Sequence, residues 1–555
     1  MSVVTESVEW SFAREGELPG EEWDAWVVPA FGDSDEWAAS LPEEIRSSVA
    51  EARSRGVRLE AKGRVECWPT HGRLPVPYLI VCGFGDGRDG RRTTTRDVRT
   101  ALAEAGRLAA DRKLAALAVS LPYAATVDDG GAFGAFAAFG AKGAREPFFA
   151  PRRVEESWPL TVRAAAEGLL LGAYRPPSYR SQADDEAGRF PIRRVRFFVG
   201  DNQTDPPSLE RAAEAAERTA DATAFARDLT NTPADRLGPS ELAQQAAELA
   251  AEYGFECEVL DEREMRARGM NGVCAVGAGS VRPPRLIALK YRGASRAMSD
   301  DVHVSEAIGL VGKGVVFDTG GLCIKSCEGM EEMIGDMGGA AAVLAVCRAI
   351  GRWKPPIDVV AVVPAVENMP SGTAFRPGDV IRTYSGKTVE VANTDAEGRI
   401  ILADAVAYAR ELGAGRLIEV STLTGSALAT FGGVATPVTS NDAAFLEHFL
   451  ESARLSGERM WPMPVFDEYL DWVKSDVADV RNLGNPSKWA GAITAALFVG
   501  MFAESTPWIH LDIGGTFWLR KRCGTEPERA TGAAVRTILY YLERIAEGLG
   551  GNTFE

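Results

Sequence analysis

The chain has 555 residues, 46% of them hydrophobic and 25% charged, which is the composition of an ordinary globular protein rather than of a fibrous or disordered one. Its formal net charge of -17 argues against nucleic acid as the main partner, because phosphate binding requires clustered Lys and Arg. The N-terminus lacks a basic start followed by an apolar stretch, and no run of about 18 apolar residues occurs, so we expect a cytoplasmic protein without a membrane contact.

The first part of the chain is expected to form a small N-terminal α/β domain over residues 1–205. Apolar runs predict strands, and a helical period predicts helices between them. The expected strands are 23–31, 77–84, 113–121 and 193–200, and the expected helices are 96–112 and 158–172. The segment 128–144 is rich in Gly, Ala and Phe and is given no role.

The second part is expected to be a larger α/β domain over residues 231–555, reached through a connecting helix at 206–230. Its strands read as continuous apolar runs separated by helices, which indicates a mostly parallel sheet covered on both faces. These runs are 285–291, 307–312, 357–366, 416–423 and 507–513. In such sheets, ligands bind beyond the carboxyl ends of the strands.

Polar residues that could carry chemistry follow several of these strands. A glycine-rich turn after one strand offers Lys313, Asp318 and Lys325, and Asp336 precedes a helix-like run. In the segment NTDAEGRI, Asp395, Glu397 and Arg399 stand at i, i+2 and i+4. If this segment is extended, the three side chains project to one face.

Four carboxylates in one pocket would repel one another unless cations balance them. Two divalent ions neutralise Asp318, Asp336, Asp395 and Glu397, and Lys313 could then bind as a neutral amine. The four histidines are scattered and no H-E-x-x-H occurs, so any metal is held chiefly by carboxylates. This cluster by itself also fits another dinuclear hydrolase, such as a phosphoesterase.

Four motifs in order, GKGVVFDTGG, GDMGGAAAV, ENMPSGTAFRPGD and NTDAEGRI, resemble the leucyl aminopeptidase (cytosol aminopeptidase) family of dinuclear metallopeptidases. The similarity covers roughly residues 225–540. It implies hydrolysis of the N-terminal residue, preferably apolar, from peptides with a free N-terminus, and assembly into a homohexamer.

The resemblance also implies a role for each motif residue. Lys313, Asp318, Asp336 and Glu397 would hold the tighter metal, and Asp318, Asp395 and Glu397 the exchangeable one. The ions would be Zn, Mn or Co, with Mg possible, since oxygen ligands and one amine accept several of them. A water between them would become the nucleophile. Lys325 would face the developing oxyanion, and Arg399 would hold a bicarbonate ion that acts as the general base.

The substrate-binding residues follow from the same resemblance. Thr422, Leu423 and Gly425 would align the substrate backbone, whereas Met333, Gly514 and Phe517 would line the pocket for the first side chain. Family members often have Ala in place of Gly514 and Met in place of Phe517, differences that keep the pocket apolar but change its shape.

Two other functions are compatible with parts of this sequence. A phosphoesterase would cleave p-nitrophenyl phosphate and not leucine-p-nitroanilide. A non-catalytic binding or regulatory protein, for example a DNA-binding one on the same fold, is opposed by the complete ligand set and by the net charge of -17.

Overall fold

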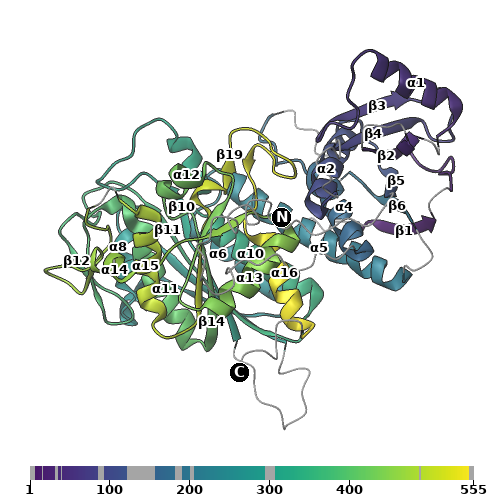
Figure 1. Cartoon of the computed structure of the whole chain (residues 1–555). Coiled ribbons are helices and arrows are strands. Elements are labelled where there is room, and N and C mark those ends of the chain that lie inside the picture. Colours follow the sequence, from purple (N-terminus) through teal and green to yellow (C-terminus); the bar gives the residue numbers. More distant parts are fainter. Residues whose placement is uncertain are drawn as a thin grey trace, which may run out of the picture. The chain divides into compact units, whose positions relative to one another are not determined.

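The computed structural model describes residues 7–14, 17–31, 36–38, 41–85, 93–121, 157–181, 191–200, 205–293, 307–486 and 489–548. The chain divides into two compact units (Figure 1). Unit 1 comprises Met1–Ala224, Arg454–Gly457 and Lys521–Pro527, and unit 2 comprises Phe225–Ala453, Glu458–Arg520 and Glu528–Glu555. The division falls within the long helix α5 (Pro206–Asn231). The segment 128–144 lies outside the described residues.

Unit 1 is built on a six-stranded sheet with the order β1-β6-β5-β2-β4-β3. Its pairs are parallel except β3 with β4, which is antiparallel. The elements are β1 (Glu9–Arg14), β2 (Ala25–Phe31), α1 (Glu43–Ser54), β3 (Val65–Pro69), β4 (Tyr78–Gly85), α2 (Thr95–Asp111), β5 (Ala116–Leu121), α4 (Trp158–Ala173) and β6 (Arg194–Val199).

Alternating residues of this sheet form two cores, one on each face, as the two-residue period of a strand requires. On one face, Val27 and Val119 pack with residues of α2, α4 and α5. On the other face, Trp26 and Val28 pack with residues of α1. The sheet is therefore covered by helices on both faces.

Unit 2 is built on a nine-stranded sheet with the order β16-β15-β18-β14-β9-β11-β8-β7, and β10 pairs with β11. The central pairs β18-β14, β14-β9 and β9-β11 are parallel, and the flanking pairs β15-β18, β11-β8 and β8-β7 are antiparallel. The strands are β7 (Glu256–Leu260), β8 (Arg285–Arg292), β9 (Ala307–Gly312), β10 (Gly314–Asp318), β11 (Asp358–Asn368), β14 (Ala414–Ser421), β15 (Thr436–Ser440), β16 (Met460–Pro462) and β18 (Trp508–Asp512).

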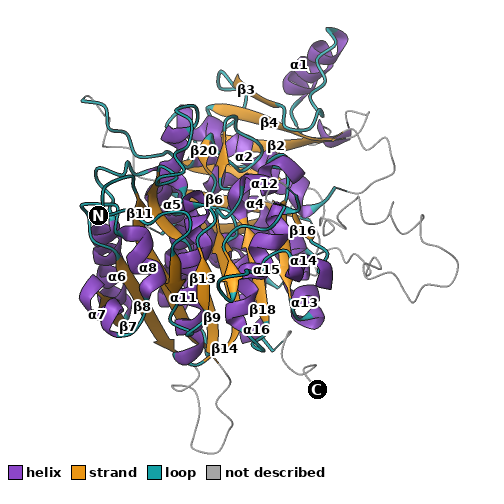
Figure 2. Ribbon diagram, turned by 90° about the vertical axis from the view of Figure 1, so that its left-hand side faces the viewer, coloured by secondary structure: helices purple, strands orange, loops and turns teal. Residues whose placement is uncertain are grey.

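Helices lie on both faces of this sheet (Figure 2). One core joins α8, α11 and α15 to β9, β11 and β14, and α10 contacts β9, β11 and β14 as well. The longer helices are α6 (Pro239–Tyr253), α10 (Gly338–Trp353), α11 (Glu397–Glu411), α13 (Ala443–Ser456), α15 (Gly491–Ala503) and α16 (Val535–Ala546), and the short ones are α7 (Glu262–Ala267), α8 (Asn271–Gly277), α12 (Gly425–Phe431) and α14 (Asp467–Asp471).

One helical stretch of the described chain, Met330–Trp353, is long and apolar enough to cross a membrane by length and composition. However, 89% of its apolar window is buried inside the structure. Continuous hydrophobicity around a helix is typical of burial in the core of a large domain. The stretch is therefore interpreted as a core helix.

Candidate metal centre

The first group of predicted residues follows the central strands β9 and β10. Lys313 stands between the two strands, and Asp318 ends β10. Gly320 and Gly321 then have φ of +85° and +64°, a backbone conformation that residues with a side chain rarely adopt, so the chain can turn sharply here. The Asp318 Oδ1 accepts hydrogen bonds from the Gly320 amide and from Asn368 Nδ2, both at 2.8 Å. These two donors fix the carboxylate at the end of its strand.

Asp336 stands between the short 3-10 helix η2 (Met330–Gly335) and α10, as the sequence predicts. Its Oδ1 accepts hydrogen bonds from Lys313 Nζ at 2.7 Å and from the Thr422 hydroxyl at 2.6 Å. Its Oδ2 is buried and has no hydrogen-bond partner among the described residues. One oxygen is therefore held by protein, and the other remains for a cation.

The segment that carries Asp395, Glu397 and Arg399 is not extended, so the strand geometry that would project the three side chains to one face does not occur. Thr394–Ala396 form the 3-10 turn η3, and α11 begins at Glu397. Asn393 caps this turn, since its side-chain oxygen accepts from the Asp395 amide at 2.8 Å. The carboxylates nevertheless converge, because the turn and the first residue of the helix face the same pocket.

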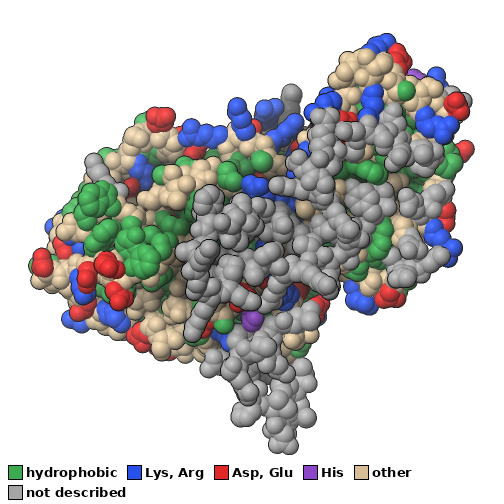
Figure 3. All heavy atoms as spheres, in the orientation of Figure 1, with side chains coloured by type: hydrophobic (Ala, Val, Ile, Leu, Met, Phe, Trp, Pro, Cys, Tyr) green, Lys and Arg blue, Asp and Glu red, His purple; other side chains and the backbone are tan. Residues whose placement is uncertain are grey.

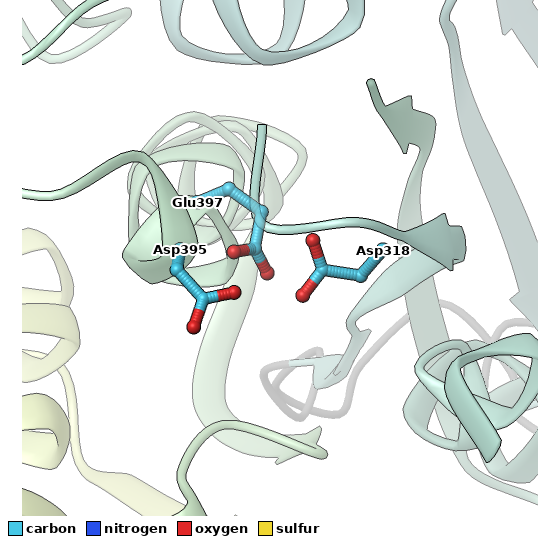
Figure 4. Close-up of side chains that lie close together, drawn as sticks. All are labelled: Asp318, Asp395 and Glu397. Atoms are coloured by element: carbon cyan, nitrogen blue, oxygen red, sulfur yellow. The ribbon is translucent and has the colours of Figure 1, made fainter. Parts of the chain in front are cut away.

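Three carboxylates from three elements, β10, η3 and α11, approach one another most closely. Ligand oxygens of Asp318, Asp395 and Glu397 all lie within 4.8 Å of one another. Figure 4 shows Asp318 on one side, facing Glu397 and Asp395 across the pocket. Lys325 Nζ lies 2.8 Å from Asp318 Oδ2 and also pairs with Asp395. The predicted metal ligands and Lys325 therefore belong to one site.

Lys313 is buried among acceptors. Its Nζ lies 2.7 Å from Asp336 Oδ1, 3.0 Å from Glu397 Oε1 and 3.0 Å from the Thr422 carbonyl oxygen. The lysine packs on the first turn of α11, where a Cβ at Gly398 would lie 2.7 Å from Lys313 Cε, so glycine is needed there. Burial by itself lowers the pKa of Lys313, but the carboxylates of Asp336, Glu397 and Asp318 outweigh it and raise the pKa. A neutral amine at this position requires cations that offset these carboxylates.

The repulsion that the sequence predicts for an acidic cluster is reflected in the pKa values of Asp336 and Asp395. Burial, followed by repulsion from Asp318 and Glu397, raises the pKa of Asp336 to about 8 against the attraction of Lys313. Burial and Asp318 likewise raise the pKa of Asp395 to about 6. Buried oxygens without a hydrogen-bond partner among the described residues include Asp336 Oδ2 and Glu397 Oε2. Such a donor set fits divalent cations, which would satisfy these oxygens and remove the repulsion.

Arg399 lies two residues into α11 and is buried. Its Nη1 donates to the Asn482 carbonyl oxygen at 2.5 Å, and its Nε has no partner among the described residues. Burial lowers the pKa of Arg399 to about 10, against the attraction of Asp512 and Glu397. A buried guanidinium with an unused donor fits a small planar anion such as bicarbonate.

The predicted substrate-binding residues lie around this cluster in several loops. Thr422, Leu423 and Gly425 follow β14 and lead into α12, whereas Gly514 and Phe517 follow β18. The Phe517 ring covers Gly335, where a Cβ would meet it at 2.5 Å. A Cβ at Gly514 would lie only 2.5 Å from the Thr424 carbonyl oxygen, so alanine does not fit here without a shift. Met333 belongs to η2, the same short helix that precedes Asp336.

Two residues that support the site were not assigned a role from the sequence. Asn368 donates from its Nδ2 to Asp318 Oδ1 and, at 3.0 Å, to the Thr394 carbonyl oxygen. Asn482 donates to the carbonyl oxygens of Asn393 and Ala396 at 2.7 and 3.1 Å. Asn368 stands in the motif ENMPSG and could have been singled out there, whereas Asn482 has no local signal.

Comparisons with known proteins point to one family. Residues 224–539 match the catalytic domain of the cytosol aminopeptidase family. A protein named probable cytosol aminopeptidase from Alkaliphilus metalliredigens (strain QYMF) is 44% identical over 385 residues, which are 69% of this chain and 75% of the relative. One of the same name from Geobacter sp. (strain M21) is 37% identical over 475 residues, covering 86% of this chain and 87% of the relative.

Solved structures also resemble the whole chain. The bottromycin maturation enzyme BotP is 30% identical, has a TM-score of 0.74, and covers 95% of this chain and 100% of its own. A second structure of that enzyme, described as a complex with Mn, also has a TM-score of 0.74, with 30% identity over 94% of this chain and 99% of its own.

Proposed function

Because the chain belongs to the cytosol aminopeptidase family and is a metal-dependent aminopeptidase, we propose that it removes N-terminal residues at a centre of two divalent metal ions held by the residues around Lys313. The observation that carries this proposal is the convergence of three carboxylates at a place where Asp336 Oδ2 and Glu397 Oε2 are buried and have no hydrogen-bond partner among the described residues. The family match does not favour a phosphoesterase or a non-catalytic binding protein.

Two overlapping ligand sets would hold the ions. One ion would be bound by Lys313, Asp318, Asp336 and Glu397. The other ion would be bound by Asp318, Asp395 and Glu397, so Asp318 and Glu397 serve both. The convergence of Asp318, Asp395 and Glu397 within 4.8 Å supports this sharing. When bound, such ions polarise a scissile carbonyl and acidify a water molecule. Zn, Mn, Co and Mg are all compatible with these ligands.

The remaining charged residues would act on the substrate. The buried carboxylate of Asp336, beside the ion that it would bind, would also hold the free α-amino group of a peptide, which gives a reason to require an unblocked N-terminus. Lys325, which already reaches Asp318, would turn its ammonium toward negative charge on the scissile carbonyl oxygen. Arg399 would hold bicarbonate at its unused Nε, and that anion would accept a proton as the general base.

The pocket for the first side chain would be apolar. Met333 and Phe517 contribute hydrophobic surface, and Gly514 lies so close to the loop that carries Thr424 that a Cβ would meet the Thr424 carbonyl oxygen at 2.5 Å. We therefore propose a preference for apolar N-terminal residues, in a protein that acts on peptides in the cytoplasm. Thr422, Leu423 and Gly425 would align the peptide backbone.

We further propose a homohexamer, as the family resemblance implies. Exposed aromatic side chains are available for subunit contacts, since Phe466 is 57% and Trp489 is 63% exposed. Hydrophobic side chains gather at the side of the larger unit where Figure 1 labels α14 and α15 (Figure 3). Light scattering coupled to size-exclusion chromatography tests this assembly, and a monomer at micromolar concentration contradicts it.

An activity panel tests the proposed function. The purified chain, loaded with Zn, Mn, Co or Mg, is assayed on leucine-p-nitroanilide, on its N-acetylated form and on p-nitrophenyl phosphate. We expect hydrolysis of the first substrate alone, loss of activity after chelation and recovery when metal is added back. Cleavage of the acetylated anilide at a similar rate, or of the phosphate ester alone, contradicts the proposal.

A further inference from the structure

Asp512, the last residue of β18, is buried beside the site and has no assigned role. Its Oδ1 accepts hydrogen bonds from the Leu423, Thr424 and Gly514 amides at 3.1, 3.2 and 3.0 Å. Its Oδ2 accepts a hydrogen bond from the Thr424 hydroxyl at 2.6 Å. One carboxylate thus joins the loop after β14 to the loop after β18, and both loops carry predicted substrate contacts.

The peptide group between Thr422 and Leu423 is held at both ends. Its N–H, from Leu423, points to Asp512, and its carbonyl, from Thr422, accepts from Lys313 Nζ at 3.0 Å. In a planar trans peptide the N–H and C=O point in opposite directions, so one rigid group separates Asp512 from Lys313. Lys313 thus holds the Thr422 end of this peptide group, and Asp512 holds the Leu423 end.

The next peptide group obeys the same rule. Its N–H, from Thr424, also points to Asp512, so the Leu423 carbonyl points away from this carboxylate. Two successive N–H groups of the loop thus point to one carboxylate oxygen. The Leu423 carbonyl is then the acceptor that this peptide group presents to a substrate.

Thr424 extends the same arrangement into α12. Its hydroxyl donates to Asp512 and accepts from the Ala427 amide at 3.0 Å, so it caps the helix that starts at Gly425. Arg399 is drawn to Asp512 by its opposite charge. Both carboxylate oxygens of Asp512 thus accept hydrogen bonds, and none of these four bonds comes from a predicted metal ligand.

We propose that Asp512 is a positioning residue for the aminopeptidase reaction, which fixes Thr422–Gly425 so that the Leu423 carbonyl faces a backbone N–H of the bound peptide. This inference rests on the proposed function. A loop that loses this anchor would still fold but would present its carbonyl in several directions. Loss of orientation lowers the rate of the chemical step even where binding is retained.

The test compares Asp512 with Asp404, a second buried aspartate in the same unit. Asp404 accepts the Val273 and Tyr384 amides at 3.0 and 2.7 Å, away from the site. Asp512→Asn keeps the shape but loses the charge, and Asp512→Ala loses the acceptor as well. Asp404→Asn and Asp404→Ala are the matched controls. Values of kcat and KM for a leucyl tripeptide are measured at saturating metal, with metal content and urea unfolding measured alongside.

We expect kcat to fall about 10-fold in Asp512→Asn and about 100-fold in Asp512→Ala, with wild-type metal content. The Asp404 variants should lose stability but keep kcat within about 2-fold. Equal kcat values in folded Asp512→Asn and Asp404→Asn, or loss of metal from Asp512→Asn, overturn the inference. If Asp512→Ala does not fold, Asp512→Asn and Thr424→Val, which lacks the hydroxyl, still decide it. An inactive wild-type enzyme would instead contradict the proposed function.

Discussion

The two halves of the metal centre differ in how far water reaches them. In the inner half, Lys313 and Asp336 expose only 3% and 7% of their side chains. In the outer half, Lys325 and Asp395 expose 24% and 31%. Since solvent access controls how readily an ion exchanges its ligands for water, an ion of the inner half should leave more slowly. The difference in burial supports the proposal of one tight and one exchangeable ion.

The halves also differ in how their carboxylates are oriented. Asp336 Oδ1 is fixed by the Thr422 hydroxyl at 2.6 Å as well as by Lys313. The Asp395 carboxylate contacts Lys325, a residue that also pairs with Asp318. The Asp336 carboxylate of the inner half is thus oriented by the neutral Thr422 hydroxyl. The Asp395 carboxylate of the outer half depends instead on Lys325, whose ammonium group would turn toward the substrate during the reaction. Three predictions examine this difference, and a fourth concerns a buried pair outside both halves.

The largest effect is expected where both halves share a ligand. Glu397→Gln removes a charge from both proposed metal sites, so both ions should be lost, and kcat/KM should fall by at least about 1,000-fold, a few kcal/mol of metal assistance. Metal analysis and leucine-p-nitroanilide hydrolysis measure this. The matched control is Glu411→Gln, at the other end of α11, which should keep both ions. A Glu397→Gln enzyme with two ions and full activity refutes the shared ligand.

The next prediction separates the halves. Asp336→Asn should abolish activity at every metal concentration, because it removes a ligand of the buried ion. Asp395→Asn should raise the metal concentration that gives half-maximal activity about 10- to 100-fold and recover at higher concentration. Titration of each variant with Mn measures both. The same response to metal in the two variants would mean that burial does not distinguish the halves.

A smaller effect is expected from the donor that orients Asp336. Thr422→Val keeps the shape but removes the hydroxyl, so the metal needed for half-maximal activity should rise up to about 10-fold. Thr230→Val is the control, because Thr230 is also buried but donates to the Ala226 carbonyl oxygen in α5. If Thr422→Val needs no more metal than the control, then Lys313 alone is enough to orient Asp336.

How much of this centre could be read from the sequence depends on the kind of contact. The family and the mixed α/β class are confirmed, and the strands with continuous apolar runs occur close to their predicted positions. The extended conformation considered for the segment with Asp395, Glu397 and Arg399 does not occur, because the cap formed by Asn393 favours a turn and a helix over a strand. This cap could have been recognised, since Asn before an apolar run is a helix-start signal.

Supporting residues from distant parts of the chain could not be predicted. Asn482 and Asp512 reach the site from segments about 90 residues beyond their partners, and nothing in their local patterns indicates those contacts. Their roles depend on which loops the parallel strands β14 and β18 bring together. The ligand roles themselves remain predictions, which the variants above test.

The smallest effect concerns a buried ion pair outside both halves. His510 Nδ1 contacts Glu419 between the paired strands β18 and β14, and both side chains are buried. Burial by itself lowers the pKa of His510, but Glu419 and Asp512 outweigh it and Arg399, so the pKa is raised. The stabilisation is therefore complete below about pH 6.5, the unfolded value, and is lost as the pH rises through the raised pKa, by about 1.4 kcal/mol per pKa unit.

The difference in unfolding free energy between the wild type and His510→Gln should shrink from pH 6 to pH 9, as measured with urea. His71→Gln, on an exposed turn, is the control. A difference that grows with pH would mean that the His510 ring is neutral in the folded protein. Burial would then lower the pKa of His510 by more than the neighbouring Glu419 carboxylate raises it.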